Sequence, residues 1–483
     1  MKLVLAVIDG LKPSMLERAI ATGRAPALKA IRDRGTYVDD CSAAFPSVTP
    51  VCAATIATGR LQDGHHIPSM NWYSRAEGRY VEYGSSFSAA RRFGINRQLI
   101  DTIFNMNGEH LSQDVRTVFE ALDDADVRTA GTTYLMYRGR HTHEVSRDFA
   151  LTRLASTLFR RSVQGPRELF YADIFASRKT GCWSQLGLPG VRDQHTGCVG
   201  SYLVEHDLFD FMLFSLPDND THSHKNGPHA QVASIATADR ELERLMHAGG
   251  GTDAFLDAHA VIVMADHSHA PVEQTIDFVG AFEEWEVMQP SGARGEHAEI
   301  ALCPAQRSAM VYALLEEGRD AALPRLVQTA RAIEGVDLVM WRAGGQAWIA
   351  GERGELRFAP GGEIRDPRGG RWHVEGELDT LTARIEDGTL RCEQYPDALA
   401  RVWAALDCPT SGDVLLSAAP AYEFPDWGGV AHVGGGSHGS LHRADSLGAL
   451  LFCGVEPPPE RARDGAWSIA DVTPMAVAHF HPR

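Results

Sequence analysis

Three short apolar runs, each followed by acidic or histidine side chains, are the feature that most constrains the fold. They cover residues 3–8, 209–216 and 260–265. The polar segments that follow them are Asp9, residues 218–224 and residues 266–269. Continuous apolar runs of this length are typical of strands buried on both faces of a parallel sheet. We therefore expect three central strands that end at one edge of a sheet.

Helical patterns separate these runs. They are expected over residues 13–21, 26–34, 112–125 and 228–247. Strands that alternate with helices predict an α/β fold with a doubly wound, mostly parallel sheet. Ligands bind such sheets beyond the carboxyl ends of the strands, which is where the Asp and His residues are expected.

Residues 286–424 have a different character, with a Gly-rich strand-turn-strand pattern from 339 to 358. We interpret this stretch as a smaller α+β domain inserted into the sheet domain. The sheet domain would then consist of residues 1–285 and 425–483. The length of 483 residues would equally suit about three separate domains, so the insertion is an interpretation of the pattern.

The charge balance excludes some classes of partner. There are 46 Lys and Arg against 63 Asp and Glu, a net charge of −17. Proteins that bind nucleic-acid duplexes usually show the reverse, because phosphate backbones are held by positive charge. An anionic ligand would need a local source of positive charge, and the 21 histidines and surplus carboxylates make bound metal a candidate.

The sequence predicts no membrane span, because no stretch approaches about 20 apolar residues. Its first residues fit a buried strand better than a signal peptide. The eight cysteines are scattered without CxxC spacing and are expected to be reduced and mostly buried. Together these features predict a cytoplasmic protein. They give no prediction of oligomeric state.

Four separated segments carry side chains of the kinds that bind metals. They are Asp9, 218–224, 266–269 and 434–439. Mixed imidazole and carboxylate sets suit zinc best, with manganese or iron as alternatives. The set is too large for one tetrahedral ion and is about right for two.

A fifth segment, residues 45–59, places the hydroxyls of Ser47 and Thr49 just before a helical run of small residues. The amino-terminal end of a helix favours an alkoxide and an approaching anion, because its dipole and free N–H groups point there. Contact with a metal would activate such a hydroxyl further.

Taken in order, these segments resemble the dispersed motifs of the alkaline phosphatase superfamily, and most of all the type I phosphodiesterase/nucleotide pyrophosphatase family. The matching motifs are Asp9-Gly10, 45–49, Thr58-Gly59, Asp220 with 224–228, Asp266-His267 and His438-Gly439. The resemblance covers about residues 1–285 and 425–483. Residues 286–424 match only as a variable cap that would select the substrate.

The resemblance implies two zinc ions and a nucleophile. One ion would be held by Asp220, His224 and His438. The other would be held by Asp9, Asp266 and His267, and touched by Thr49 as nucleophile. Asp218 and His222 have the same spacing as Asp220 and His224 and stay open as an alternative pair, and Ser47 is the reserve nucleophile. Asp218, His222 and His269 are expected to orient ligands rather than bind metal.

The implied activity is hydrolysis of phosphodiester or pyrophosphate bonds through a phosphothreonine intermediate. The substrate would be a small phosphate ester, with nucleotides or nucleotide-sugars among the candidates. A phosphomonoesterase or phosphonate hydrolase of the same fold is the alternative, and a catalytically silent, metal-stabilised binding protein is a further one.

The phosphate-holding groups depart from the family pattern. No Asn follows Thr49 closely, and the candidate position is Cys52, a poor donor. Pro50 has no N–H to offer. Other groups must therefore hold the phosphate, and the candidate substrate contacts besides Cys52 are Trp72, Tyr73, Arg138, Arg140 and His143.

Overall fold

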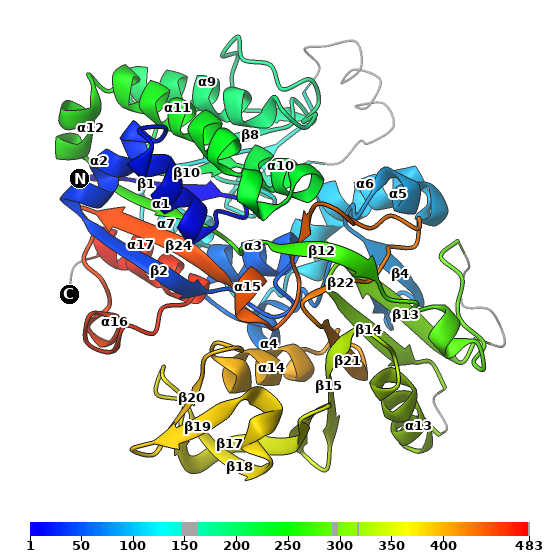
Figure 1. The fold of residues 1–483 in the computed structure, drawn as a ribbon. Coiled ribbons are helices and arrows are strands. Elements are labelled where there is room, and N and C mark those ends of the chain that lie inside the picture. The colour runs from blue at the N-terminus through cyan, green and yellow to red at the C-terminus, as the bar shows by residue number, and fades with distance from the viewer. Residues whose placement is uncertain (147–161, 292–297, 316–317, 482–483) are drawn as a thin grey trace.

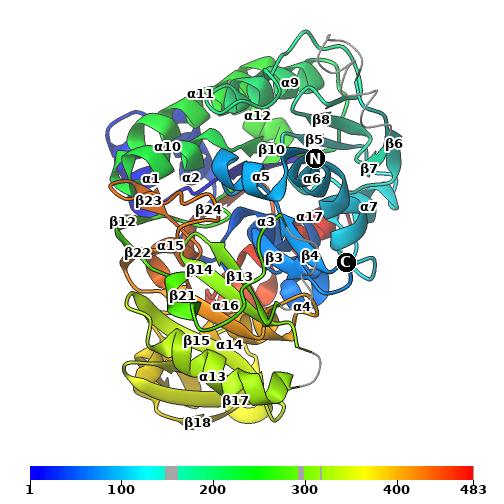
Figure 2. The same cartoon turned by 90° about the vertical axis from the view of Figure 1, so that its right-hand side faces the viewer.

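The computed structural model describes residues 1–146, 162–291, 298–315 and 318–481. Within these ranges it contains an eight-stranded sheet covered by helices and a nine-stranded sheet at the opposite end of the molecule from α9 and α11 (Figure 1). A view from the side shows the same arrangement (Figure 2).

The large sheet has the strand order β2-β24-β11-β1-β10-β5-β8-β9. Its strands are β1 (Lys2–Ile8), β2 (Thr36–Ser42), β5 (Thr129–Thr132), β8 (Glu168–Tyr171), β9 (Phe175–Ala176), β10 (Phe211–Leu216), β11 (His259–Met264) and β24 (Leu447–Cys453). The five from β11 to β8 run parallel, whereas β2, β24 and β9 are antiparallel to their neighbours. The three predicted strands are β11, β1 and β10, side by side at the centre.

Helices cover both faces of this sheet, as a doubly wound fold requires. One face carries α1 (Pro13–Ala21), α2 (Pro26–Arg34), α9 (Arg192–Glu205), α11 (Val232–Ala248) and α12 (Thr252–Ala258); the other carries α3 (Thr49–Thr58), α7 (Val118–Asp123) and α17 (Val472–Phe480). Alternate residues of β1 face the two layers, so every β1 residue from Leu3 to Ile8 is buried.

Among the described residues, no helix is both long and apolar enough to cross a membrane.

The predicted helix over 112–125 is shorter than expected. Helix α7 begins only at Val118. The Thr117 hydroxyl accepts from the Glu120 N–H while the Glu120 carboxylate accepts from the Thr117 N–H, a capping box that fixes the start of the helix. Local hydrogen bonding therefore sets a boundary that the apolar pattern does not reveal.

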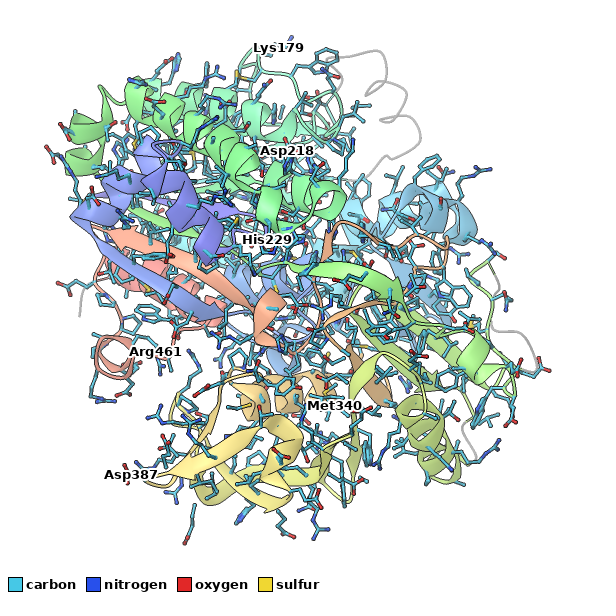
Figure 3. The ribbon with its side chains drawn as sticks, viewed as in Figure 1. Lys179, Asp218, His229, Met340, Asp387 and Arg461 are labelled. Carbon is cyan, nitrogen blue, oxygen red and sulfur yellow. A yellow bond between two sulfur atoms is a disulfide. The ribbon has the colours of Figure 1, made fainter. Side chains whose placement is uncertain are left out.

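The second sheet is built entirely from residues inside the predicted insertion. Its strands are β13 (Ile300–Ala305), β14 (Ser308–Ala313), β15 (Val336–Ala343), β16 (Gln346–Gly351), β17 (Gly354–Arg365), β18 (Arg371–Gly376), β19 (Ala383–Glu386), β20 (Thr389–Cys392) and β21 (Val414–Ala418). Helix α13 (Arg319–Arg331) packs on one face and α14 (Ala398–Asp407) on the other. Asp387, in the turn between β19 and β20, marks the outer end of this sheet (Figure 3).

The insertion shares its core with the large-sheet domain. Leu399 and Val402 of α14 belong to the same buried cluster as the small residues of α3. Helix α14 also contacts α4 (Gln62–His65), which follows α3. Because burying a shared apolar surface stabilises both partners, the insertion is held against the sheet domain as one packed body.

The remaining described elements lie outside the two large sheets and the helices named above. They are β3 (Asn71–Ser74), β4 (Arg79–Glu82), α5 (Phe87–Phe93), α6 (Ile95–Ile100), the π-helix η1 (Asp101–His110), β6 (His141–His143), β7 (Val163–Gly165), α10 (Asp218–Asn226), η2 (Pro228–Ala230), β12 (Ala270–Thr275), η3 (Gly280–Phe282), η4 (Leu378–Leu381), β22 (Ala421–Glu423), β23 (Gly436–Ser437), α15 (Arg443–Ser446), α16 (Pro459–Asp464) and η5 (Ile469–Asp471). Strands β22, β12 and β23 form a small third sheet.

The expectation that all eight cysteines are reduced is wrong in the structure. Cys182 and Cys198 form a disulfide that ties the loop before α9 to that helix. The two cysteines lie 16 positions apart, and this spacing alone does not reveal the pair. Of the other six, five are buried thiols and Cys392 is half-buried.

Candidate active site

The carboxyl edge of the large sheet gathers the acidic and histidine segments. In register, Ile8 at the end of β1 lies opposite Leu216 of β10, and Val7 lies opposite Met264 of β11. The three strands therefore end at nearly the same level, and the residues that follow them leave the sheet at one place. Helix α10 begins two residues after β10. The loop after β23 adds His438.

Three imidazoles surround a single carboxylate oxygen, Oδ1 of Asp220. Its distances to Nε2 are 2.9 Å for His269, 3.3 Å for His224 and 3.4 Å for His438. The four ligand atoms all lie within 4.8 Å of one another. Burial alone would raise the pKa of Asp220, but the neighbouring His224 and the hydrogen bond from His269 hold it well below its usual value.

A second group adjoins the first. Nε2 of His267 lies 3.4 Å from Oδ1 of Asp9, 3.4 Å from Oδ2 of Asp266 and 3.3 Å from Oγ1 of Thr49. Burial raises the pKa of Asp266 to about 6. Burial, together with the charges of Asp266 and Asp220, raises the pKa of Asp9 well above its usual value. Buried carboxylates this close repel each other unless a proton or a cation lies between them.

Two buried atoms in these groups indicate that cations fit here. Nε2 of His438 and Oδ1 of Asp9 make no hydrogen bond to any described residue, although potential partners lie 3.4 Å away. A buried polar atom without a bonding partner destabilises the folded chain, and coordination of a metal ion would give these two atoms a partner. The mixed nitrogen and oxygen donors suit zinc, with manganese or iron as alternatives.

Backbone carbonyls set the orientation of the imidazoles. Nδ1 of His224 lies 2.8 Å from the Gly436 oxygen, and Nδ1 of His438 lies 2.8 Å from the Ser47 oxygen. Each Nδ1–H donates to its carbonyl, so each Nε2 turns a lone pair toward the cluster. This arrangement is typical of metal-binding histidines.

His269 differs from those two histidines. It is fully buried, and within the described part of the chain its Nδ1 has no hydrogen-bond partner. The proton is therefore best placed on Nε2, which donates to Asp220. Gly10 makes room for this ring, because a Cβ at position 10 would lie only 2.7 Å from His269. The φ of +67° at this position also favours glycine. The expected orienting role of His269 fits this geometry.

Thr49 and Ser47 occupy different environments. Thr49 is the first residue of α3 and is only partly buried, with its hydroxyl facing His267. Ser47 is fully buried; its hydroxyl donates to the Ser440 carbonyl and accepts from the Gly439 N–H. Because Ser47 already uses its hydroxyl to join two segments, the geometry favours Thr49 as the nucleophile candidate.

The alternative pair, Asp218 and His222, points away from the cluster. Asp218 accepts from the Arg192 guanidinium and from the Gly190 and Asp193 N–H groups. Nε2 of His222 lies 3.2 Å from the Ala230 oxygen. Figure 3 labels Asp218 on α10. Neither residue contributes to the two groups of candidate ligands.

The two arginines predicted to hold phosphate are already paired. Arg138 is buried and bonds Glu120 and the carbonyls of Leu111 and Ser112. Arg140 bonds Asp124 and Glu120. Each guanidinium therefore stabilises the structure around α7. These bonds do not favour a contact of either arginine with substrate, which stays a prediction.

The other predicted contacts also have structural partners. Trp72 lines a cavity of about 750 Å³ whose lining contains none of the candidate metal ligands. Tyr73 is buried against Tyr80 and Tyr312. Nε2 of His143 lies 2.7 Å from the Pro166 oxygen, and burial raises the pKa of the Cys52 thiol well above its usual value. Their role with substrate likewise stays a prediction.

Three residues near the site were not singled out by the sequence. Glu423 is buried and accepts from His432, whose ring packs against His224 with centroids 4.0 Å apart. Gln306 reaches His224 from the insertion. All three come from the insertion or its predicted border and meet the site only in the folded chain. Lone residues of this kind gave no spacing pattern that could reveal them.

Comparisons with known proteins identify the family of the chain and its fold. Residues 3–331 match the family model described as type I phosphodiesterase / nucleotide pyrophosphatase. No curated protein sequence is significantly similar to the chain.

Among solved structures, phosphonoacetate hydrolase from Sinorhizobium meliloti 1021, in complex with phosphonoformate, superposes with a TM-score of 0.57 at 18% identity, covering 99% of this chain and 96% of that one. Murine ectonucleotide pyrophosphatase / phosphodiesterase 5 gives a TM-score of 0.57 at 11% identity, covering 100% and 95%. At these identities the likeness shows a shared fold.

Proposed function

Because the chain belongs to the type I phosphodiesterase / nucleotide pyrophosphatase family, we propose that it is a two-metal hydrolase that uses Thr49 to cleave phosphodiester or pyrophosphate bonds. One ion would be held by Asp220, His224 and His438, and the other by Asp9, Asp266 and His267. Zinc is the first candidate, with manganese or iron as alternatives.

The observation that carries this proposal is the position of the Thr49 hydroxyl. It lies at the start of α3, 3.3 Å from a candidate ligand atom of His267. A structure of murine ectonucleotide pyrophosphatase / phosphodiesterase 5 in complex with AMP is of an inactive variant in which one threonine is replaced by alanine. A threonine nucleophile in this chain would agree with that finding on its structural neighbour.

The proposed reaction assigns a task to each group. Bound metal ions would neutralise charge on the phosphate and lower the pKa of the Thr49 hydroxyl. Thr49 Oγ1 loses its proton to solvent and attacks phosphorus. The bond from phosphorus to the ester oxygen breaks, the leaving oxygen takes a proton from water, and a phosphothreonine forms. Water hydrolyses this ester in a second step and restores the hydroxyl. His269 keeps Asp220 oriented, and the carbonyls of Ser47 and Gly436 keep His438 and His224 turned inward.

The insertion is the proposed source of substrate selection. Its β13–β14 hairpin reaches the candidate metal group through Gln306, so a domain outside the large sheet borders the reaction site. The substrate is proposed to be a small phosphate ester such as a nucleotide.

A cytoplasmic location stays a prediction, and the Cys182–Cys198 disulfide is more typical of an oxidising compartment.

A phosphonate hydrolase is the second candidate function. Its support is the superposition on phosphonoacetate hydrolase, whose identity of 18% exceeds the 11% of the murine phosphodiesterase at the same TM-score. The missing donor at Cys52 also leaves the phosphate-holding groups of this chain unlike those expected for nucleotide pyrophosphatases.

Rates on three substrates separate these functions. The zinc-loaded protein is assayed with bis-p-nitrophenyl phosphate, p-nitrophenyl phosphate and phosphonoacetate. We expect the diester to be cleaved with the highest kcat/KM. A preference for the monoester or for phosphonoacetate would replace the proposal by the corresponding activity. Full metal content without turnover of any of the three would favour a silent binding protein.

A further inference from the structure

The turn between β13 and β14 delivers one side chain of the insertion to the candidate metal group. Ala305 and Ser308 pair across this hairpin, so Gln306 and Arg307 form a two-residue turn. Nε2 of Gln306 lies 3.4 Å from Nε2 of His224.

Gln306 has a backbone conformation that its side chain does not favour. Its φ is +61°, a left-handed value that hairpin turns normally give to Gly, Asn or Asp. Such a backbone conformation is strained and persists only where the surroundings hold it, most often at functional sites. The strained backbone at Gln306 therefore points to a function for its side chain.

The next residue fixes this turn in place. Arg307 is fully buried and its guanidinium bonds Asp445 and the carbonyls of Tyr422 and Ala419. The Arg307 N–H donates to the carbonyl of His438, a candidate ligand. The turn is thus fixed to the loop that carries His438, and the backbone at Gln306 cannot move away from the site without breaking these bonds.

The Gln306 amide has unused hydrogen-bonding capacity. Among the described residues no group bonds its Oε1, although this atom is buried. Its Nε2 faces the lone pair of His224, because His224 donates its Nδ1–H to Gly436. A metal ion on His224 would occupy that lone pair, and the amide N–H groups would then face the site without an acceptor.

The helix end beneath the site has few donors left for a phosphate. Pro50 has no N–H, and the N–H groups of Val51 and Cys52 both donate to the Val48 carbonyl. The Cys52 thiol is a weak donor. A phosphate beside Thr49 would therefore gain from a donor on another element, and the Gln306 amide is a neutral donor held next to a candidate ligand.

We propose that Gln306 binds the substrate directly, by donating an amide hydrogen bond from the insertion to a non-bridging oxygen of the phosphoryl or phosphonyl group. This inference rests on the proposed function, and it names the group that holds the anion where the family's usual donor is missing. It also gives the insertion a contact with the reacting group itself.

Orthophosphate binding by zinc-loaded protein tests the proposal. Titration calorimetry gives its Kd for the wild type, Gln306→Leu and Gln306→Gly, with zinc content measured on each sample. We expect both variants to keep their zinc and to bind orthophosphate about tenfold or more weakly, the usual scale for losing one hydrogen bond to a charged group. Because glycine accepts a positive φ, Gln306→Gly should also unfold at the same or a higher temperature.

A matched control is Gln346→Leu, which removes an amide next to another turn of the same sheet and should bind orthophosphate like the wild type. Unchanged affinity in both Gln306 variants overturns the inference and leaves the hydrolase proposal standing. Loss of zinc from Gln306→Leu overturns it in favour of a role in holding the metal. Absence of both orthophosphate binding and ester turnover in the wild type overturns both proposals.

Discussion

The hydroxyl of Thr49 lies 3.3 Å from Nε2 of His267, although 218 positions separate these residues in the chain. Thr49 starts α3 on one face of the sheet, and His267 follows the central strand β11. The contact places a hydroxyl, a helix end and a candidate metal ligand together. A group that can act as a nucleophile is therefore held where a cation would lower its pKa.

Replacing Thr49 should separate chemistry from metal binding. Thr49→Ala removes the attacking oxygen, so kcat on bis-p-nitrophenyl phosphate should fall by at least about 10³-fold. Zinc content should stay close to that of the wild type, because the carboxylates and imidazoles remain. Thr49→Ser keeps a hydroxyl and serves as the matched control, with at least about a tenth of the activity retained. Wild-type turnover by Thr49→Ala with zinc bound would exclude Thr49 as nucleophile.

The orientation of α10 predicts that two histidines on the same helix behave differently. His224 faces Asp220 and His438, whereas His222 faces the Ala230 carbonyl. His224→Ala should weaken zinc binding by at least about 100-fold, more than the loss of an orienting group usually costs. His222→Ala should bind zinc within a fewfold of the wild type. Competition with a chromophoric chelator measures both affinities, and the reverse order would restore Asp218 and His222 as the ligand pair.

His269 is predicted to act through Asp220. Its Nε2–H donates to Asp220 Oδ1 at 2.9 Å, and its replacement would leave that carboxylate free to rotate. His269→Ala should lower zinc affinity by about 10–100-fold. His269→Gln, which can still donate a hydrogen bond, should recover part of the loss. If His269→Gln binds zinc as weakly as His224→Ala does, His269 is a direct ligand.

The buried Asp193 predicts a pH dependence of stability. Burial, with a contribution from Asp218, raises its pKa to about 8, against 3.8 for an unperturbed Asp. Between about pH 4 and 8 the folded chain thus holds a proton that the unfolded chain has released. This group should make the free energy of unfolding fall as pH rises, by up to about 1.4 kcal/mol per pH unit.

Asp193→Asn removes this titration while keeping an oxygen for the Asp218 N–H, which Asp193 accepts at 3.0 Å. The variant should gain stability relative to the wild type as pH rises from 5 to 8. Urea unfolding in the presence of a chelator measures this without a contribution from metal. Asp387→Asn, in the turn between β19 and β20, is the control and should follow the wild-type profile. Parallel profiles for Asp193→Asn and the wild type would contradict the prediction.

The large sheet follows from local patterns of apolar residues in the sequence. Apolar runs such as 3–8 become central strands because both faces of the sheet are covered. Helix ends are less predictable, since the start of α7 depends on hydrogen bonds between Thr117 and Glu120. The Cys182–Cys198 disulfide is unpredictable for a related reason: the approach of a loop to helix α9 is not encoded in the spacing of the two cysteines.

The candidate site divides in the same way. Asp9, Asp220 and Asp266 follow strands or begin a helix, so sequence alone predicts that they meet at one sheet edge. Arg138 and Arg140 looked like phosphate-holding groups from composition, yet the fold pairs both with carboxylates near α7. Free charge cannot be judged from sequence, because pairing depends on which distant residues become neighbours.

By itself the sequence determined the parallel sheet and the edge where the Asp and His side chains gather, because both depend on residues close together in the chain. Tertiary structure alone decided which of the two histidines on α10 turns toward the cluster and which carbonyl accepts the hydrogen bond of the Ser47 hydroxyl. It also decided that Gln306 reaches the site from the insertion. These outcomes depend on how separate segments pack, and packing joins residues whose separation in the chain carries no signal.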